Sequence, residues 1–98
     1  MKGEGRELIK FDWDKGNSDN NKKHDISDQE AEEAFFDEEK IIHEDRFHSE
    51  KEDRFIILGK TKKGELLFIS YTIRGDLVRI ISARRINKKE VHIYEKET

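Results

Sequence analysis

The segment RFIILGKTKKGELLFISYTIRGDLVRIISARR, residues 54–85, decides the fold. It contains three runs rich in β-branched and aromatic residues, separated by two short turns that each contain a glycine. This pattern predicts an antiparallel meander with strands over 54–61, 65–73 and 77–85. Leu66-Leu67-Phe68-Ile69 is apolar at every position, so we expect the middle strand to be central in the sheet and covered on both faces.

The residues before this segment predict helices and two short strands. Leu8 to Trp13 predicts a first strand, and Ile41 to His43 predicts a second. Asp14 is a candidate N-cap for a weakly helical stretch that reaches His24. Ser27-Asp28-Gln29-Glu30 is a capping box, in which two side chains satisfy free amides of the first helical turn. It predicts a helix that carries Ala31, Ala34 and Phe35.

A second capping box, Asn87-Lys88-Lys89-Glu90, predicts a last helix that carries Val91, Ile93 and Tyr94. The elements together predict an α+β fold, an antiparallel sheet with N-terminal helices packed on it and a C-terminal helix. We expect residues 1–98 to form a single domain. Within it we expect residues 1–6 to be disordered and the nearly all-polar residues 44–53 to be a mobile loop.

The composition excludes several classes of protein. The chain has no cysteine, so neither a disulfide framework nor a thiolate metal site is possible. No stretch near the start has the apolar length of a signal peptide. No segment approaches the ~18 apolar residues of a membrane span. We therefore expect a cytoplasmic protein with no membrane partner.

The net charge of −3 conceals a strong asymmetry. Residues 1–53 carry 9 basic and 18 acidic side chains, a balance of −9, and residues 54–98 carry 11 and 5, a balance of +6. A basic half favours binding of a polyanion, which an acidic half would repel. The alternative is that the charges interleave in the fold and leave no patch.

Arginines interrupt the apolar run of the last predicted strand. A strict period of two places Arg79 on one face together with Ala83 and Arg85, and places Arg84 on the other with Ile80 and Ser82. An arginine in a sheet needs a matching anion, which is either a phosphate or a carboxylate of the same chain. The ion pair is the better hypothesis for one arginine alone, and a polyanion site is the better one for the whole set. That set comprises Arg54, Arg74, Arg79, Arg84 and Arg85.

The candidates for proton transfer at neutral pH are the four histidines His24, His43, His48 and His92. None has the helical spacing to a second ligand that signals zinc, so we expect no metal site. His24 follows Lys23 just before a helix cap, where it either faces a phosphate or is a solvated surface residue. Tyr71 and Tyr94 either contact a base or phosphate of a nucleic acid or pack in the core.

Several motifs occur in one order along the chain. In the first half these are Phe11-Asp12-Trp13-Asp14, Asn21 with Lys23-His24, Glu30, Glu33-Ala34 and Phe36-Asp37. In the second half they are Arg54-Phe55, Leu58-Gly59, Gly64, Leu67, Tyr71-Thr72, the run Arg79-Ile80-Ile81-Ser82-Ala83-Arg84, Glu90 and Tyr94. This order resembles the BrnT toxin family, also known as DUF497, and the arginine run is its specific part. The chain departs from the family at Asp25, where a glycine is usual, and at Glu38, where a proline is usual.

The resemblance implies a RelE-like fold and a metal-independent endoribonuclease without cofactor. It also implies the toxin of a type II toxin–antitoxin pair, which inhibits growth and translation. A BrnA-like antitoxin would neutralise it, and DNA would be contacted only through the complex. Metal-free RNA cleavage needs proton transfer and cationic stabilisation of the phosphorane. The catalytic residues implied are His24 or a nearby carboxylate, Glu30 or Glu33, for proton transfer, and Arg54, Arg79 and Arg84 for the phosphate. The RNA-binding residues implied are Lys23, Tyr71, Arg74, Arg85 and Tyr94.

Two other hypotheses remain open at this point. The chain could be a non-catalytic module that binds RNA or protein, or a structural subunit whose arginines pair with its own acidic half. Residues 25–53 carry 13 acidic and 3 basic side chains. We expect this stretch to face away from RNA and to receive a basic segment of the antitoxin.

Overall fold

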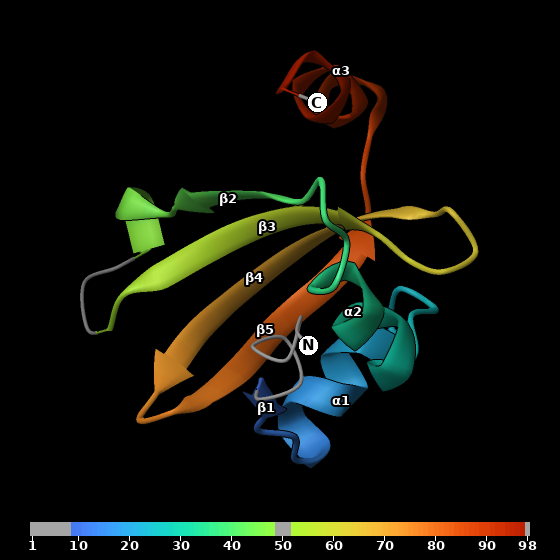
Figure 1. Cartoon of the computed structure of the whole chain (residues 1–98). Coiled ribbons are helices and arrows are strands. Elements are labelled where there is room, and N and C mark those ends of the chain that lie inside the picture. Colours follow the sequence, from blue (N-terminus) through green and yellow to red (C-terminus); the bar gives the residue numbers. More distant parts are fainter. Residues whose placement is uncertain (1–8, 49–51, 98) are drawn as a thin grey trace, which may run out of the picture.

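The computed structural model describes residues 9–48 and 52–97 (Figure 1). Five strands form one sheet in the order β1-β5-β4-β3-β2. The strands are β1 Lys10–Phe11, β2 Ile41–Glu44, β3 Arg54–Lys60, β4 Leu66–Arg74 and β5 Leu77–Arg85. The helices are α1 Lys15–Lys22, α2 Asp28–Ala34, the short 3-10 helix η2 Arg46–His48 and α3 Lys88–Glu97. The α+β prediction is confirmed, and the predicted meander forms the centre of the sheet with β4 in the middle.

The sheet differs from the prediction in that it is mixed. β1 runs parallel to β5, with Lys10 opposite Leu77 and Phe11 opposite Val78. The amide of Asp12 still donates to the carbonyl of Val78 at 2.8 Å, and the chain then turns into α1. This edge strand is therefore shorter than the strand predicted over 8–13. The relation to RelE-like folds stays a prediction.

Side-chain caps start all three α-helices. Ser27 and Glu30 form the predicted capping box of α2, with bonds of 3.0 and 2.9 Å. Asn87 and Glu90 exchange the equivalent bonds at α3, at 3.0 and 2.9 Å. At α1, Asp14 Oδ1 accepts from the amide of Asn17 at 3.2 Å, and Asn17 Oδ1 accepts from the amide of Asp14 at 2.7 Å. The local signals for helix starts are thus confirmed.

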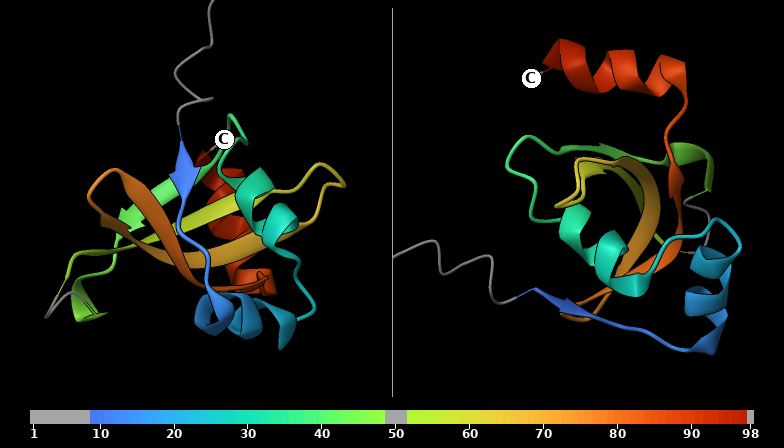
Figure 2. Two further views of the ribbon diagram at one scale, coloured as in Figure 1. Left: turned by 90° about the horizontal axis from the view of Figure 1, so that it is seen from below. Right: turned by 90° about the vertical axis from the view of Figure 1, so that its right-hand side faces the viewer.

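Helices cover the two faces of the sheet unequally. α2 packs on one face, and α3 lies over the other face at one end of the sheet (Figures 1 and 2). The main core lies between α2 and the sheet and contains Ile26, Ala31, Ala34, Phe35, Ile57, Leu67, Ile69, Tyr71, Ile80 and Ala83. A smaller cluster under α3 contains Ile41, Leu58 and Tyr94, with Leu66 and Phe68 packed against it. β4 is therefore covered on both faces, as its continuous apolar run predicts.

A glycine allows the close contact between α2 and β3. A Cβ at Gly59 would collide with the carbonyl oxygen of Ala34. The missing side chain lets the last turn of α2 rest directly on the strand.

A β-bulge interrupts β5. Ser70 lies opposite Ser82, whereas the next residue of β4, Tyr71, lies opposite Ile80. Ile81 is therefore an extra residue on β5, and the alternation of faces restarts after it.

The bulge makes the strict alternation predicted for this strand wrong. Ile80 and Ala83, three residues apart, both point into the main core. The register places Arg79, Ser82 and Arg84 together on the face away from α2. Arg85 lies on the other face, opposite Leu67 of the main core. The arginines of one strand are thus divided between two faces.

The loop predicted over 44–53 is partly structured, because β2 extends to Glu44 and η2 follows it. Residues 49–51, and residues 1–6 for which we expect disorder, lie outside the described residues. Among the helices that the structure describes, none is long and apolar enough to cross a membrane.

Candidate functional site

Two arginines flank a buried threonine on the face away from α2. Arg54 of β3 and Arg79 of β5 both lie in register with Thr72 of β4, so the three side chains point to the same face. Thr72 is 1% exposed, and its hydroxyl donates to the carbonyl of Asp53 at 2.6 Å. Two strand spacings separate the arginines, about 10 Å between their backbones. Such a pair of guanidinium groups can address one polyanionic ligand.

Polar side chains continue this surface toward α3. Ser70 and Ser82 lie opposite each other, and His43 of β2 follows in the same row beyond Ile56. Both serines are half-buried and His43 is exposed. We call the surface formed by Arg54, Ser70, Thr72, Arg79 and Ser82 the arginine face.

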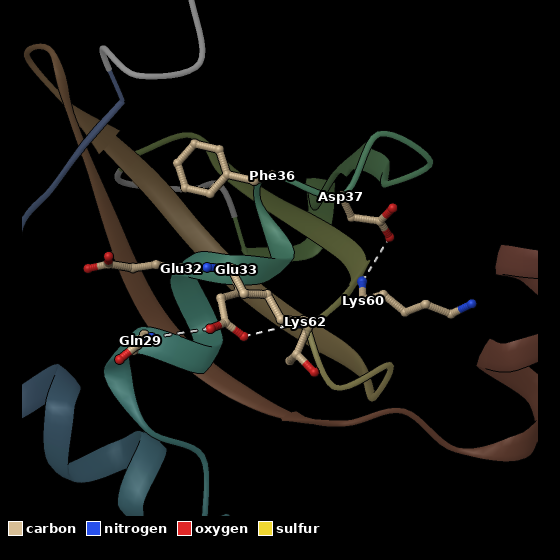
Figure 3. A pocket seen from close by; sticks show the side chains of 8 residues that line it. Gln29, Glu32, Glu33, Phe36, Asp37, Lys60 and Lys62 are labelled. Carbon is tan, nitrogen blue, oxygen red and sulfur yellow. Dashed lines mark hydrogen bonds between the residues drawn. The ribbon is translucent and has the colours of Figure 1, made fainter.

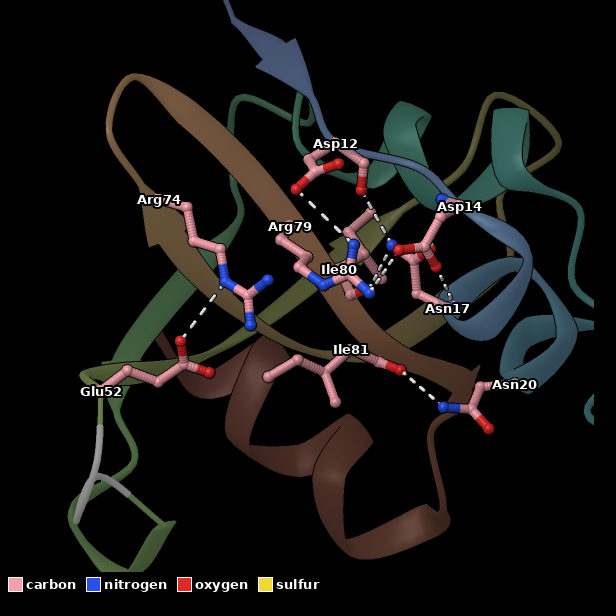
Figure 4. Close-up of polar contacts among 9 residues, drawn as sticks. All are labelled: Asp12, Asp14, Asn17, Asn20, Glu52, Arg74, Arg79, Ile80 and Ile81. Atoms are coloured by element: carbon pink, nitrogen blue, oxygen red, sulfur yellow. Dashed lines mark hydrogen bonds and ion pairs between the residues drawn. The ribbon is translucent and has the colours of Figure 1, made fainter.

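Two carboxylates hold the side chain of Arg79 (Figure 4). Its Nη2 lies 2.9 Å from Asp14 Oδ2, and its Nη1 lies 3.6 Å from Asp12 Oδ2. The Arg79 side chain is 17% exposed, whereas the side chains of Asp12 and Asp14 are 32% and 56% exposed. A largely buried guanidinium needs such counter-ions, and these two remain open to solvent. A hydrogen bond from the amide of Asn17 is the main reason that the pKa of Asp14 is lowered. The Arg79 guanidinium lowers this pKa further.

α1 fixes the backbone that carries Arg79. Nδ2 of Asn17 donates to the carbonyls of Asp12 and Ile80, both at 2.9 Å, and Nδ2 of Asn20 donates to the carbonyl of Ile81 at 3.2 Å (Figure 4). Asn17 is only 3% exposed. These bonds satisfy carbonyls at the bulge, where the ladder to β4 is irregular. The two asparagines therefore hold the bulge in place, and the bulge in turn fixes the backbone of Arg79.

Arg84 shares the face of Arg79 but joins α3 to the sheet. It forms a two-pronged ion pair with Glu90, at 2.7 and 3.0 Å, and its guanidinium carbon lies 4.2 Å from the ring centre of Phe68. The hydrogen bond from Arg84 is the main reason that the pKa of Glu90 is lowered. Arg74, at the end of β4, lies 3.5 Å from Glu52. For Arg74, Arg79 and Arg84 the structure therefore contains carboxylate partners within the chain.

The remaining charged candidates gather near the start of α2. Arg85 pairs with Glu65 at 3.0 Å and donates to the backbone carbonyl of His24 at 3.2 Å. The amide of Ser27 is the main cause that lowers the pKa of Glu30, and Arg85 contributes. We call His24, Glu30 and Arg85 the α2 cluster. Lys23 precedes His24 after the end of α1 and is exposed. Arg85 lies six positions after Arg79 on β5, about 20 Å along the strand, and the two side chains lie on opposite faces.

Glu33 lines a pocket of about 570 Å³ between α2 and the end of β3 (Figure 3). Its Oε1 accepts from the amide of Lys62 at 3.1 Å. Asp37, in the same pocket, accepts from the amide of Lys60 at 2.8 Å. These carboxylates hold the turn between β3 and β4 against α2, so Glu33 has a structural contact and lies away from the arginine face.

Tyr71 and Tyr94 are buried, at 6% and 3% exposure. Tyr71 packs between Phe35 and Phe55, with ring centres at 5.0 and 5.4 Å, and burial raises its pKa. The Tyr94 hydroxyl donates to Asp37 at 2.7 Å. Both tyrosines therefore pack in the core, which was the alternative to a contact with nucleic acid. Neither ring has a free face on which a base could stack.

The motifs do not predict a functional role for Asp12 and Asp14, and Asp14 is expected only as a helix N-cap. They surround Trp13, whose Nε1 donates to Glu32 of α2 at 2.6 Å and so fixes the segment on the helix. The signal that could have found them is a pair of acids two apart, directly before a helix, in a chain that needs counter-ions for a strand of arginines.

A model of the ribonuclease toxins BrnT of type II toxin–antitoxin systems matches residues 13–90. The chain belongs to the BrnT family. No curated protein matches the chain. The match extends from Trp13, just before α1, through the whole arginine run, which confirms the resemblance in the sequence. A toxin of this class implies an RNA substrate and an antitoxin partner. Among the described residues, no three His, Asp or Glu side chains come together as a metal site.

Proposed function

We propose that this chain is an endoribonuclease that cleaves RNA at the arginine face without a metal ion, and that it thereby inhibits translation and growth. The family supports ribonuclease activity. The observation that carries the location is Arg79, which is largely buried, fixed by the bulge and flanked by two solvent-accessible carboxylates. This combination supports the proposal, because a cation that can bind the phosphate lies beside a carboxylate that can accept a proton.

Cleavage of RNA through its own 2′-hydroxyl requires three catalytic functions. A base takes the hydroxyl proton, cations stabilise the phosphorane as the 2′-oxygen bonds to phosphorus, and the 5′-oxygen leaves with a proton. In this proposal Arg79 and Arg54 bind the phosphate and stabilise the phosphorane, and Asp12 is the base that takes the 2′-hydroxyl proton. Asp12 is suited because its contact to Arg79, at 3.6 Å, is the longer of the two and is the easier to exchange for substrate. Water supplies the proton to the leaving oxygen in this scheme.

Of the groups that the family resemblance implies for proton transfer, His24 and Glu30 belong to a second location and Glu33 belongs to the pocket beside α2. His24 and Glu30 lie in the α2 cluster, where Arg85 is the cation. A reaction centred on Arg79 does not use them. We favour the arginine face because Glu30 is committed to the helix cap and Arg85 to Glu65.

We further propose that a BrnA-like antitoxin neutralises the toxin and carries any contact with DNA. Because the toxin would act on RNA and inhibit translation, we expect it to act in the cytoplasm. A basic antitoxin segment fits the acidic residues 25–53, as the charge count predicts.

Incubation of the purified chain with RNA in excess EDTA tests the activity and its independence from metal. We expect cleavage products that end in 2′,3′-cyclic phosphate, and no cleavage of the same oligonucleotide with 2′-O-methyl groups. Activity that appears only with added Mg²⁺ would contradict the metal-free scheme. Binding of RNA without cleavage would favour the non-catalytic module.

A further inference from the structure

The outer edge of β2 is an open end of the sheet. β2 pairs with β3 on one side, and among the strands that the structure describes none pairs with its other side. Ile42, His43 and Glu44 are all exposed. Edge strands are often protected by lysine, proline or a bulge, and β2 has none of these over its four residues.

The ladder identifies the backbone groups that point outward. The amide of Asp45 donates to the carbonyl of Arg54 at 2.8 Å, so Asp45 and Arg54 form a hydrogen-bonded pair of the antiparallel ladder. Hydrogen-bonded and non-bonded pairs alternate along such a ladder. His43 therefore bonds inward to β3, and Ile42 and Glu44 direct their N–H and C=O groups away from the sheet.

Apolar side chains accompany this edge. Ile42 is 48% exposed, and Phe47 of η2, three residues beyond β2, is 92% exposed. Phe47 has the largest exposed fraction among the apolar side chains that the structure describes as exposed. An incoming strand could pair with the backbone and cover these side chains at the same time.

The negative charge around β2 favours a basic partner at this edge. Residues 37–46 carry five acidic side chains and two basic ones, a balance of −3. A second copy of this chain at the same edge would bring an equal negative charge, whereas a basic segment would be attracted.

We propose that β2 is the docking edge for a basic, extended segment of the antitoxin, which adds to the sheet as a strand beside β2. This inference rests on the proposed function, since it takes the antitoxin as the partner. The added strand would lie about 10 Å from β3, the strand of Arg54. Every second side chain of it would point toward the arginine face, where it could exclude RNA.

Proline at an outward position tests this pairing. Glu44→Pro removes an outward N–H and leaves the bonds from β2 to β3 intact, a position that edge strands tolerate. Glu44→Thr is the matched control, because it makes the same change of charge but keeps the N–H. The probe is a purified BrnA-like antitoxin, titrated against each full-length toxin variant by calorimetry.

We expect Glu44→Pro to bind about fivefold to tenfold more weakly than Glu44→Thr, the effect of one lost backbone hydrogen bond. Ile42→Pro, at the other outward position, should weaken binding similarly, and thermal unfolding checks that both proline variants fold. Equal affinities of Glu44→Pro and Glu44→Thr would overturn the proposal. So would a dimer of the toxin alone, in sedimentation, that Glu44→Pro dissociates.

RNA cleavage by the same variants separates this inference from the proposed function. Glu44→Pro should cleave RNA like the parent and need more antitoxin for inhibition. A parent chain that binds the antitoxin but never cleaves RNA would refute the ribonuclease and leave the docking edge intact.

Discussion

The arginine face and the α2 cluster place arginines of the same strand in opposite settings. The side chain of Arg79 is 17% exposed and held by two carboxylates at a locked bulge, whereas that of Arg85 is 47% exposed and paired with Glu65 across the strand. An exposed ion pair contributes little to stability and can reorganise freely. A buried guanidinium is already in position and needs little reorganisation to receive a charged ligand. The comparison supports our proposal that Arg79, and not Arg85, contacts the reacting phosphate, because the Arg79 side chain is buried and held in position.

The largest expected effect separates these two arginines. Arg79→Ala should lower the rate of RNA cleavage about 100-fold to 1000-fold, as the loss of a preorganised charge donor does in other active sites. Arg85→Ala, the matched control, should stay within about threefold of the parent, because it removes an exposed surface pair. The measurement is single-turnover cleavage of a labelled RNA. If both variants were folded and lost cleavage activity equally, Arg79 would have no special role compared with Arg85.

The second effect concerns the carboxylates beside Arg79. Asp12→Asn should lower cleavage about 100-fold, the usual contribution of a general base. Asp14→Asn should retain more activity and lower the melting temperature only slightly, because asparagine still caps the helix but removes one of the two charges beside Arg79. pH–rate profiles of both variants show which one loses the dependence on a base. A loss confined to Asp14→Asn would contradict the role of Asp12.

The smallest effect concerns the anchor of α3. Arg84 holds the pKa of Glu90 below its usual range, so the pair stabilises the fold above the usual carboxyl pKa and is lost as the pH falls through the lowered value. Glu90→Gln keeps the capping box and should cost about 1 kcal/mol at pH 7 and less at pH 3. Urea unfolding at the two pH values measures this, and Glu65→Gln, in the exposed pair with Arg85, is the control. A cost that is the same at both pH values would show that the ion pair is not its source.

Features set by neighbouring residues could be predicted from the sequence. The two capping boxes, the three strands and the central place of β4 depend on short patterns, and the structure confirms each of them. The parallel partner of β1 could not be predicted, because two residues carry too little pattern to choose an edge of the sheet.

The candidate site was predicted only in part, for a physical reason that lies at Ile81. One extra residue in β5 reverses the faces of all residues beyond it, and a period of two cannot reveal where it occurs. Asn17 and Asn20 disfavour helix by propensity, yet they lie in α1, where they bond to β5. Their role depends on a contact some sixty residues away along the chain, and so it becomes visible only in the fold.

The most direct test of the arginine face is to observe where RNA binds. A 2′-O-methyl oligonucleotide, which cannot be cleaved through the 2′-oxygen, is titrated into the ¹⁵N-labelled chain, and the arginine Nε–H and backbone signals are followed by NMR. We predict shifts at Arg54, Arg79 and Ser82, with little change at His24 and Arg85. Shifts confined to His24, Glu30 and Arg85, with the arginine face silent, would contradict the account.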